Sequence, residues 1–342
     1  MLLLLAVGCR SEPAAGPPAA EGRPAVAAGA GGGPAGSAGP LQKLRASYSG
    51  TGTIMAAWWL ALEGGYFREQ GIDAELTLIT SGATLLAALR NGEVDLAGTG
   101  GSSMVLGYLE GLETQVIGAN VKLMESNVLV RPEIETLDDL RGKTIGVNRL
   151  KSSTDTATRV ALQRLGLRPD VDFFTRGTGG QAESLAALDA GAVDAATFGV
   201  PGLFEARRRG YRELVRIGEL GLPYANGVIG ATKGFLDRQP DLADRSLRAL
   251  VQAVSRFKTD REFASQVLGK YSQVDDRAVL DASVDYYRPL FALDPYPDRE
   301  AMQMALDAEE HPGARTARPE DVADYRFAER LRSSGFLDQL PQ

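Results

Sequence analysis

The stretch TSGATLLAALRNGEVDLAGTGGSS, residues 80–103, predicts a helix followed at once by a strand. Apolar residues at helical spacing run from 84 to 89 and stop at Asn91 and Gly92. A short strand pattern follows at 94–97, and residues 98–103 are then all Gly, Ser or Thr. We therefore expect one αβ unit with a small, hydroxyl-rich loop at each end.

A second copy of this pattern occupies residues 177–199, GTGGQAESLAALDAGAVDAATFG. The segment LAAL at 86–89 aligns with LAAL at 185–188, and a glycine, a Val-Asp pair, an alanine and a second glycine follow in both copies. The simpler interpretation is two ordinary αβ units. A repeated supersecondary unit also predicts a protein of two lobes whose corresponding loops face each other.

The same alternation of strands and helices extends over residues 44–217, which is typical of parallel α/β sheets. Residues from 234 onward are mostly helical in pattern, with segments at 242–258, 261–271, 277–286, 298–308 and 321–333. Strands are expected at 44–48, 74–79, 94–97, 115–119, 127–131, 144–147, 173–175, 194–197 and 213–217.

Composition excludes several classes of function. The chain has 342 residues, 44% of them hydrophobic, and a formal net charge of −7, which argues against nucleic acid as a partner. One Cys and one His cannot form a disulfide framework or a structural zinc cluster, so we expect no metal and no cofactor. The single histidine, His311, lies in a polar turn and is expected at the surface, where it serves no catalytic pair.

The N-terminus predicts a membrane anchor. The run MLLLLAVGC places small residues before the only cysteine and resembles the lipobox of bacterial lipoproteins, in which Cys9 is lipidated. Because the run is too short to span a bilayer and lacks a basic start, we expect 1–9 to be a shortened signal. An incidental cysteine in an apolar segment is the alternative. Residues 10–43, rich in Ala, Gly and Pro, predict a disordered tether.

Loops rich in Gly, Ser and Thr follow most of the expected strands. In open α/β sheets, small ligands bind beyond the carboxyl ends of the strands, and helix starts bind anions through free amides. Any one such loop is more often only a turn, so the prediction depends on their number and symmetric placement. No phosphate-binding fingerprint is present, which disfavours ATP and dinucleotides. Trp58 either lines the pocket beside the loop that starts at Ser49 or packs in the core.

Four motifs carry a resemblance to a known family. They are ALEGGYF at 61–67, EQGID at 69–73, GEVD at 92–95 and LDDLRGKTIGV at 137–147. They resemble the substrate-binding proteins of ABC importers, in the group that handles sulfonates, taurine, nitrate and thiamine-pyrimidine precursors. The resemblance covers about residues 44–217. The cleft has fewer aromatic residues than the pyrimidine binders of this group, which leaves the ligand class open.

The resemblance implies a two-lobed α/β fold with a hinge, C-terminal helices packed on the lobes, and ligand held between them. Lobe I would comprise 44–131 and 226–342 and lobe II 132–225, with crossovers near Arg131-Pro132 and within 221–226. Besides Trp58, the expected ligand-binding residues are Ser49, Thr51, Thr80, Ser81, Gly82, Gly100, Ser102, Asn148, Ser152, Ser153, Thr154, Gly180 and Phe198.

The implied function is a non-catalytic solute-binding lipoprotein, outside the cytoplasm and anchored through Cys9. It would be a monomer that passes a small molecule, an anion such as a sulfonate or carboxylate, to permease subunits in the membrane. Arg149, Lys151 and Arg176 lie near the loops and could offset a negative ligand. Two alternatives remain: an enzyme on the same fold, similar to a chorismate dehydratase or a pyrimidine synthase, and a ligand sensor.

Overall fold

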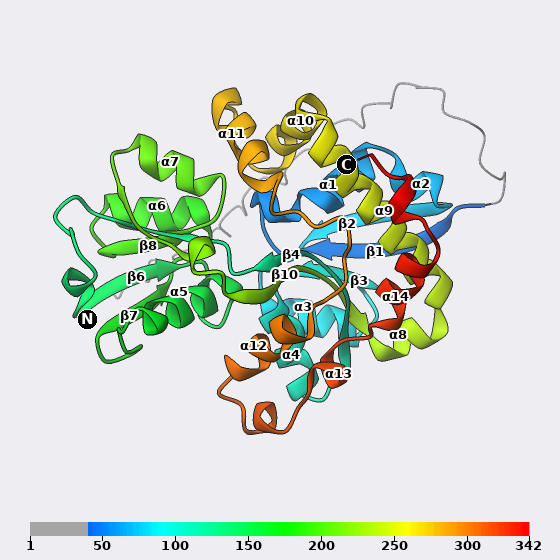
Figure 1. Ribbon diagram of the computed structural model, residues 1–342, viewed down its shortest axis with the longest axis horizontal. Helices are drawn as coiled ribbons and strands as arrows, with labels where there is room; N and C mark the ends of the chain where they lie inside the picture. The colour runs from blue at the N-terminus through cyan, green and yellow to red at the C-terminus, as the bar shows by residue number, and fades with distance from the viewer. Residues whose placement is uncertain (1–39, 342) are drawn as a thin grey trace, which may run out of the picture. The chain divides into compact units, whose positions relative to one another are not determined.

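The computed structural model describes residues 40–341 (Figure 1). The expected lipidation site, Cys9, and the expected tether up to residue 39 lie outside this range. At the other end of the expected tether, the first strand already begins at Gln42 rather than at 44.

The first sheet has the strand order β2-β1-β3-β10-β4. Strands β1, β2 and β3 are parallel, whereas β10 is antiparallel to both of its neighbours. We call this sheet and the helices on it the first lobe. Its strands are β1 (Gln42–Tyr48), β2 (Ile72–Leu78), β3 (Leu96–Thr99), β4 (Thr114–Leu123) and β10 (Pro223–Thr232), and the helices between β1 and β4 are η1 (Thr53–Met55), α1 (Ala56–Glu63), α2 (Tyr66–Glu69), α3 (Gly82–Arg90) and α4 (Gly101–Leu109).

The second sheet has the order β7-β6-β8-β5-β9 and forms, with its helices, the second lobe. Here β6, β7 and β8 are parallel, and β5 is antiparallel to β8 and β9. The strands are β5 (Asn127–Val130), β6 (Lys143–Val147), β7 (Phe173–Gly177), β8 (Ala195–Phe198) and β9 (Arg212–Arg216), and the helices are η2 (Asp138–Leu140), α5 (Ser153–Arg164), α6 (Gln181–Asp189), α7 (Gly202–Arg208) and η3 (Ile217–Leu220).

The two sheets have the same plan. In each, three parallel strands are followed by one antiparallel strand that arrives from the other lobe, and then by an outer strand. The repeated sequence falls on matching units, because residues 80–103 supply α3 and β3 while residues 177–199 supply α6 and β8. The two-lobed α/β fold expected from the repeat is therefore confirmed.

Two segments cross between the lobes, residues 124–126 and 217–222. They are hydrogen-bonded to each other: the Met124 amide donates to the Leu222 carbonyl at 3.0 Å, and the Ile217 amide donates to the Ser126 carbonyl at 2.9 Å. The first crossing lies a few residues before the position expected near Arg131, because 127–130 pairs with β8 and β9. The chain therefore joins the lobes through two adjacent connecting segments.

Strand β10 differs most from the expectation, since its sequence PYANGVIGAT contains Pro, Asn and two glycines that are typical of turns. It nevertheless forms ten residues of the first sheet, and its burial between two strands outweighs the weak local preference. Gly230 allows close packing, because a Cβ there would be 2.4 Å from the Met104 side chain. Both sheets are consequently mixed, not parallel throughout.

Most of the C-terminal helices cover the first lobe (Figure 1). Helix α9 packs on α1 and α2, α12 packs on β10, and α14 packs on β4, whereas α11 also contacts α7 of the second lobe. These elements are α8 (Lys233–Arg238), α9 (Pro240–Thr259), α10 (Arg261–Tyr271), α11 (Arg277–Tyr287), α12 (Arg299–Asp307), η4 (Pro312–Arg315), α13 (Pro319–Val322), α14 (Arg326–Ser333) and η5 (Leu337–Gln339).

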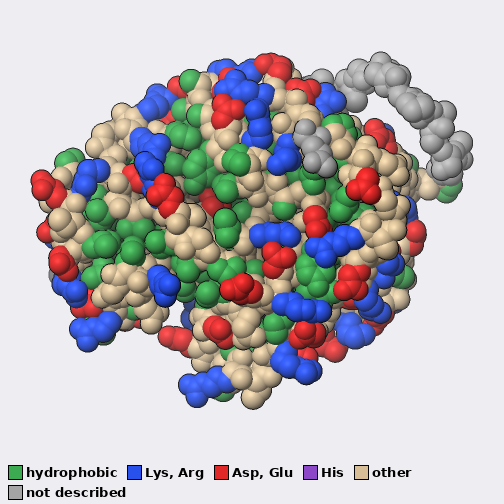
Figure 2. Space-filling model, in the orientation of Figure 1, with side chains coloured by type: hydrophobic (Ala, Val, Ile, Leu, Met, Phe, Trp, Pro, Cys, Tyr) green, Lys and Arg blue, Asp and Glu red, His purple; other side chains and the backbone are tan. Residues whose placement is uncertain are grey.

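Basic and acidic side chains are interspersed on the face shown in Figure 2, which has no broad region of one sign. Within residues 40–341, no helix is both long and apolar enough to cross a membrane. The same part of the chain contains no group of three or more His, Cys, Asp or Glu side chains that could hold a metal ion.

Candidate functional site

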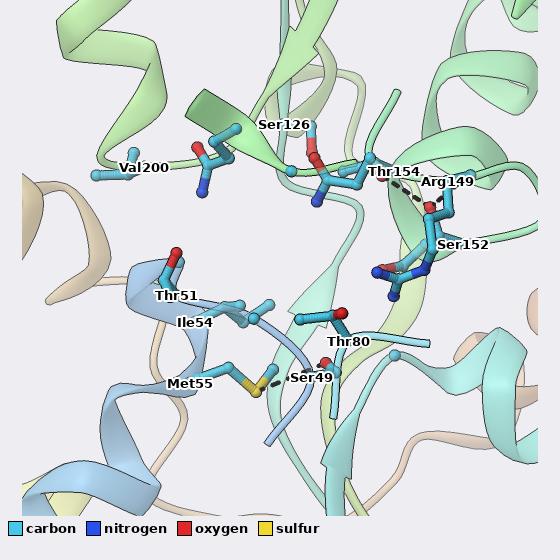
Figure 3. A pocket seen from close by; sticks show the side chains of 18 of the residues that line it. Ser49, Thr51, Ile54, Met55, Thr80, Ser126, Arg149, Ser152, Thr154 and Val200 are labelled. Carbon is cyan, nitrogen blue, oxygen red and sulfur yellow. Dashed lines mark hydrogen bonds between the residues drawn. The ribbon is translucent and has the colours of Figure 1, made fainter. Parts of the chain in front are cut away.

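A cavity of about 480 Å³ lies between the two lobes (Figure 3). Its walls come from the loops that follow the parallel strands of both sheets. The first lobe contributes residues 49–52, Thr80 and Gly100, and the second contributes 148–149, 152–154, 179–183 and the pair Gly199 and Val200. The carboxyl ends of corresponding strands therefore meet at one shared space, as expected for a ligand site in this class of sheet.

Three helices begin at this cavity. Gly100 is the N-cap of α4, Ser152 is the N-cap of α5, and Gly180 is the N-cap of α6, and all three residues line the space. No N-cap side chain accepts a hydrogen bond at these three helices. In α4 the Ser102 amide donates to the Tyr224 hydroxyl at 3.1 Å, so the first-turn amides available to a ligand are those of α5 and α6. Amides and helix dipoles converging from both lobes favour a negatively charged group.

Arg149 supplies the positive charge of the cavity. Its side chain projects from the loop after β6 into the space between the lobes (Figure 3). Burial alone lowers the pKa of the guanidinium, so none of the described carboxylates compensates its charge. A half-buried arginine without a counter-ion is costly in the free protein, and a bound anion removes that cost through charge-assisted hydrogen bonds.

Hydroxyl groups beside Arg149 are held in place by the loop itself. The Ser152 hydroxyl donates to the Arg149 carbonyl at 2.6 Å and lies 2.8 Å from the Thr154 hydroxyl (Figure 3). The Asp155 carboxylate accepts from the Lys151 amide at 2.7 Å, which fixes the turn into α5. The loop therefore presents its hydroxyls in a defined geometry before any ligand arrives.

One wall of the cavity is apolar. Ile54 and Met55 precede α1, Leu78 ends β2, and Val200 stands opposite them in the second lobe (Figure 3). Such a wall suits the carbon skeleton of an organic ligand, while the helix starts and Arg149 suit its charged head.

The back of the cavity is lined by Glu125 and Ser126 of the first crossing segment, by Asn226 of β10 and by Tyr287 of α11. Glu125 is 4% exposed, and one of its oxygens accepts a hydrogen bond from the Tyr287 hydroxyl. Burial raises the pKa of Glu125 to about 8, and the hydrogen bond from Tyr287 opposes this shift only in part. The carboxyl is therefore mostly protonated at neutral pH.

The two lobes touch beside the cavity. The Thr53 amide of the first lobe donates to the Val200 carbonyl of the second at 2.9 Å. A Cβ on Gly100 would lie 2.8 Å from the Cβ of Ser153, so only glycine fits between these loops without displacement. The described arrangement thus has the lobes in contact beside a cavity that remains partly open to solvent.

Most of the expected ligand-binding residues line this cavity. Those that do so are Ser49, Thr51, Thr80, Gly100, Asn148, Ser152, Ser153, Thr154 and Gly180.

The structure places the other expected residues elsewhere. Trp58 is buried under β3, where a Cβ on Gly98 would be 2.2 Å from its indole nitrogen. Phe198 is also fully buried in the core. Ser81 caps α3 by accepting from the Thr84 amide at 3.3 Å, and neither Gly82 nor the buried Ser102 is among the cavity residues.

Several cavity residues were not predicted from the sequence. Glu125 and Ser126 lie on the first crossing segment, and Asn226 lies in β10. Tyr287 lies on α11, and Gln273 lies in the turn before it. No local motif marks these positions, since long-range packing alone brings them to the cavity. Gln181 could have been found, because it follows the N-cap of the repeated helix; its side chain accepts from the Gly202 amide at 3.0 Å.

Comparisons with known proteins agree with this architecture. The sequence profile of the family described as NMT1/THI5 like matches residues 53–261. The search of curated proteins gave no significant sequence match.

Solved structures with the same fold are numerous. A protein of Bordetella bronchiseptica superposes with a TM-score of 0.76 at 19% identity, over 86% of this chain and 98% of the other. The periplasmic aliphatic sulphonate-binding protein SsuA of Escherichia coli gives 0.67 at 20% identity, over 87% and 99%. The periplasmic nitrate-binding protein NrtA of Synechocystis gives 0.69 at 15% identity, over 88% and 91%. At these identities the likeness establishes the fold.

Proposed function

Because the chain belongs to the NMT1/THI5-like family and has the fold of periplasmic binding proteins, we propose that it is a solute receptor of an ABC importer. It captures a small organic anion, a sulfonate or a carboxylate, between its lobes and delivers it to a membrane permease. We propose no catalytic role for the site. The structural relatives described above that bear a functional name are binding proteins for sulfonates and nitrate.

The observation that carries the proposal is Arg149 beside three helix starts. The guanidinium is desolvated without a counter-ion. The N-caps of α4, α5 and α6 line the same cavity, where α5 and α6 also have first-turn amides without a partner. Each feature favours a negative ligand, and together they surround one point from both lobes. A neutral sugar would leave the guanidinium charge uncompensated.

Ligand capture would couple to movement of the lobes. A ligand that contacts both lobes binds the closed arrangement more tightly than the open one, and it shifts the population by that difference in affinity. The proposed contacts divide accordingly. The first lobe would contribute Ser49, Thr51, Thr80 and Gly100, and the second lobe would contribute Asn148, Arg149, Ser152, Ser153, Thr154 and Gly180.

We further propose that the protein works outside the cytoplasm as a monomer held to the membrane by lipid on Cys9. The sequence around Cys9 and the Ala-, Gly- and Pro-rich residues that follow support this proposal. Mass spectrometry of the N-terminal peptide from membrane fractions would detect the lipid, and an unmodified Cys9 would contradict the anchor.

Thermal unfolding in the presence of candidate solutes tests the receptor role. We expect ethanesulfonate, nitrate or propionate to raise the melting temperature, because a ligand at one hundred times its Kd stabilises the native state by about 2.7 kcal/mol. Glycerol, which is of similar size, and the larger glucose serve as neutral controls. A rise with the neutral solutes alone would overturn the anion proposal.

A further inference from the structure

Two helices of the first lobe, α3 and α4, begin beside the cavity, but hydroxyl groups of the same lobe already occupy their starts. In α4 the Ser102 amide donates to the Tyr224 hydroxyl at 3.1 Å, and in α3 the Thr84 amide donates to the Ser81 hydroxyl at 3.3 Å. Both partners of each bond belong to the first lobe, so neither bond requires the second lobe to be near. The first lobe therefore offers an incoming anion few free amides.

The first lobe and the C-terminal helices also bring no charge to the cavity. Their described residues that line it are all uncharged: 49–52, Ile54, Met55, Leu78, Thr80, Gly100, Asn226, Gln273 and Tyr287. Hydroxyl groups such as those of Thr51 and Thr80 can bond to a ligand. Neutral hydrogen bonds are, however, roughly half as strong as those that involve a charged group. The open first lobe would therefore attract an anion only weakly.

The second lobe has the opposite character. The start of α5 has first-turn amides without a partner, and the Arg149 guanidinium projects beside it, with no counter-ion among the described carboxylates (Figure 3). The start of α6 is less open, because the Glu183 side chain folds back over it. A Cβ on Gly180 would lie 2.7 Å from Oε2 of Glu183. The strongest attraction for an anion therefore lies at Arg149 and the start of α5.

This part of the second lobe is held together without help from the first. The Ser152 hydroxyl donates to the Arg149 carbonyl at 2.6 Å, and the Lys151 amide donates to the Asp155 carboxylate at 2.7 Å. The charge of Asp155 is balanced by Arg159, which pairs with it at 2.9 Å. Because all of these residues belong to the second lobe, the loop and the start of α5 can receive an anion while the lobes are apart.

We propose that the solute docks first on the second lobe, with its anionic head at Arg149 and the start of α5, and that the first lobe then closes over it. This inference rests on the proposed function, because it assumes that the cavity binds an anion. Closure adds contacts between the lobes, such as the hydrogen bond from the Thr53 amide to the Val200 carbonyl, and brings the Thr80 hydroxyl to the ligand. Arg149 thus controls docking, whereas Thr80 acts only in the closed arrangement.

Stopped-flow measurement of closure with ethanesulfonate tests this order. Dyes attached at Arg68→Cys in the first lobe and Gln163→Cys in the second, both exposed positions, report the distance between the lobes. The full chain also carries Cys9→Ser, because Cys9 is its one natural cysteine. If docking is fast and precedes closure, the observed rate rises to a plateau as the ligand concentration increases. The half-saturating concentration then measures docking, and the rate extrapolated to zero ligand measures reopening.

We expect Arg149→Gln to raise the half-saturating concentration about tenfold or more, because a charged hydrogen bond is lost at docking. The reopening rate should not change in this variant. Thr80→Val should speed reopening about threefold to tenfold and leave the half-saturating concentration as in wild type. Glu183→Gln should lower that concentration, since its carboxylate opposes the approach of an anion. Lys151→Gln, at an exposed position outside the cavity on the same loop as Arg149, controls for general loss of positive charge.

Other outcomes would overturn the order of docking and leave anion capture intact. A higher half-saturating concentration in Thr80→Val would show that the first lobe takes part in docking. A rate that falls as ligand concentration rises would show that closure precedes binding. Equal effects of Arg149→Gln and Lys151→Gln would contradict a specific role for Arg149.

Calorimetry on the same proteins separates this inference from the proposed function. Binding of ethanesulfonate without any change in the distance between the dyes would refute closure after docking. The absence of binding by ethanesulfonate, nitrate and propionate would instead refute the proposed function. Closure at saturating ligand shows that each variant is folded, so a shifted half-saturating concentration reports docking alone.

Discussion

The α-carbon of Gly100 lies against Ser153 across the boundary between the lobes. A side-chain carbon at position 100 would be 2.8 Å from both Cβ and Oγ of Ser153, closer than real Cβ contacts come. Rotation of the serine hydroxyl cannot relieve the contact, because the Cβ is fixed by the backbone. This pair therefore sets how closely the N-termini of α4 and α5 can approach when the cavity is enclosed.

Gly100→Ala should weaken ligand binding with little effect on the stability of the free protein. Overpacking of this kind costs about 1–3 kcal/mol, and the free protein can avoid it by separating the lobes. We expect the Kd for ethanesulfonate to rise roughly tenfold or more by calorimetry. Gly82→Ala is the matched control, since the nearest atom to a Cβ there, the Ser103 hydroxyl oxygen, is 4.0 Å away. Equal affinities in the two variants would show that the Gly100 contact does not limit closure.

Arg149→Gln should weaken anion binding by about tenfold to a hundredfold, the equivalent of losing a charged hydrogen bond worth about 1.5–3 kcal/mol. The free variant should unfold at the same temperature as wild type or a higher one, because a desolvated cation has been removed. Lys151→Gln removes the same charge from the same loop at an exposed position outside the cavity. Similar losses of affinity in both variants would indicate a general effect of charge.

Glu125 should make the protein less stable as the pH rises from about 5 to 8. The folded state keeps this carboxyl protonated up to its pKa of about 8, whereas the unfolded chain releases the proton near pH 4.3. The folded state therefore binds more protons in this window, and the free energy of unfolding should fall by up to about 1.4 kcal/mol per pH unit.

Urea denaturation of wild type and Glu125→Gln at pH 5, 6, 7 and 8 measures the contribution of Glu125 to the pH dependence of the free energy of unfolding. Glu309, whose pKa burial raises to about 7, contributes a slope of the same sign to both proteins and cancels in the difference. A stability difference between the two proteins that is constant over this range would show that Glu125 ionises normally in the folded state.

Thr80 and Ser81 are adjacent but should respond differently to loss of the hydroxyl. Ser81→Ala removes the cap of α3 and should cost about 1 kcal/mol of stability, with the Kd unchanged. Thr80→Val should raise the Kd and leave stability near wild type, because Thr80 is exposed and lines the cavity. Calorimetry and chemical denaturation of both variants distinguish the two roles. The reverse pattern would place the ligand against Ser81.

The loops of the cavity could be predicted because their residue types and their positions directly after strands can be read from the local sequence. Loops after parallel strands meet at one edge of a sheet whatever the details of packing. The positions of Thr51, Ser152 and Gly180 therefore followed from recognising strands, helix starts and the repeat. The repeat predicted the two-lobed plan, and the family resemblance on four short motifs agreed with it; the structure confirms the plan.

Features that depend on long-range packing could not be predicted in this way. Trp58 became a core residue because Gly98 leaves room for its ring beneath β3. Glu125 lies in the sequence KLMESN, and no local pattern there predicts its burial. Its hydrogen-bond partner Tyr287 comes from far along the chain. Strand β10 is stabilised by two neighbouring strands that outweigh its turn-like composition.

The paired connections at 124–126 and 217–222 limit the freedom of the whole molecule. A single flexible linker would let one half swivel in any direction, but two backbones joined by Met124–Leu222 and Ile217–Ser126 hydrogen bonds bend readily about one axis and resist torsion. Closure of the lobes on any solute would then follow the same path and give the same outer surface. In the proposed import role, a permease subunit could thus distinguish the loaded from the empty protein by the shape of its surface, without contacting the bound solute.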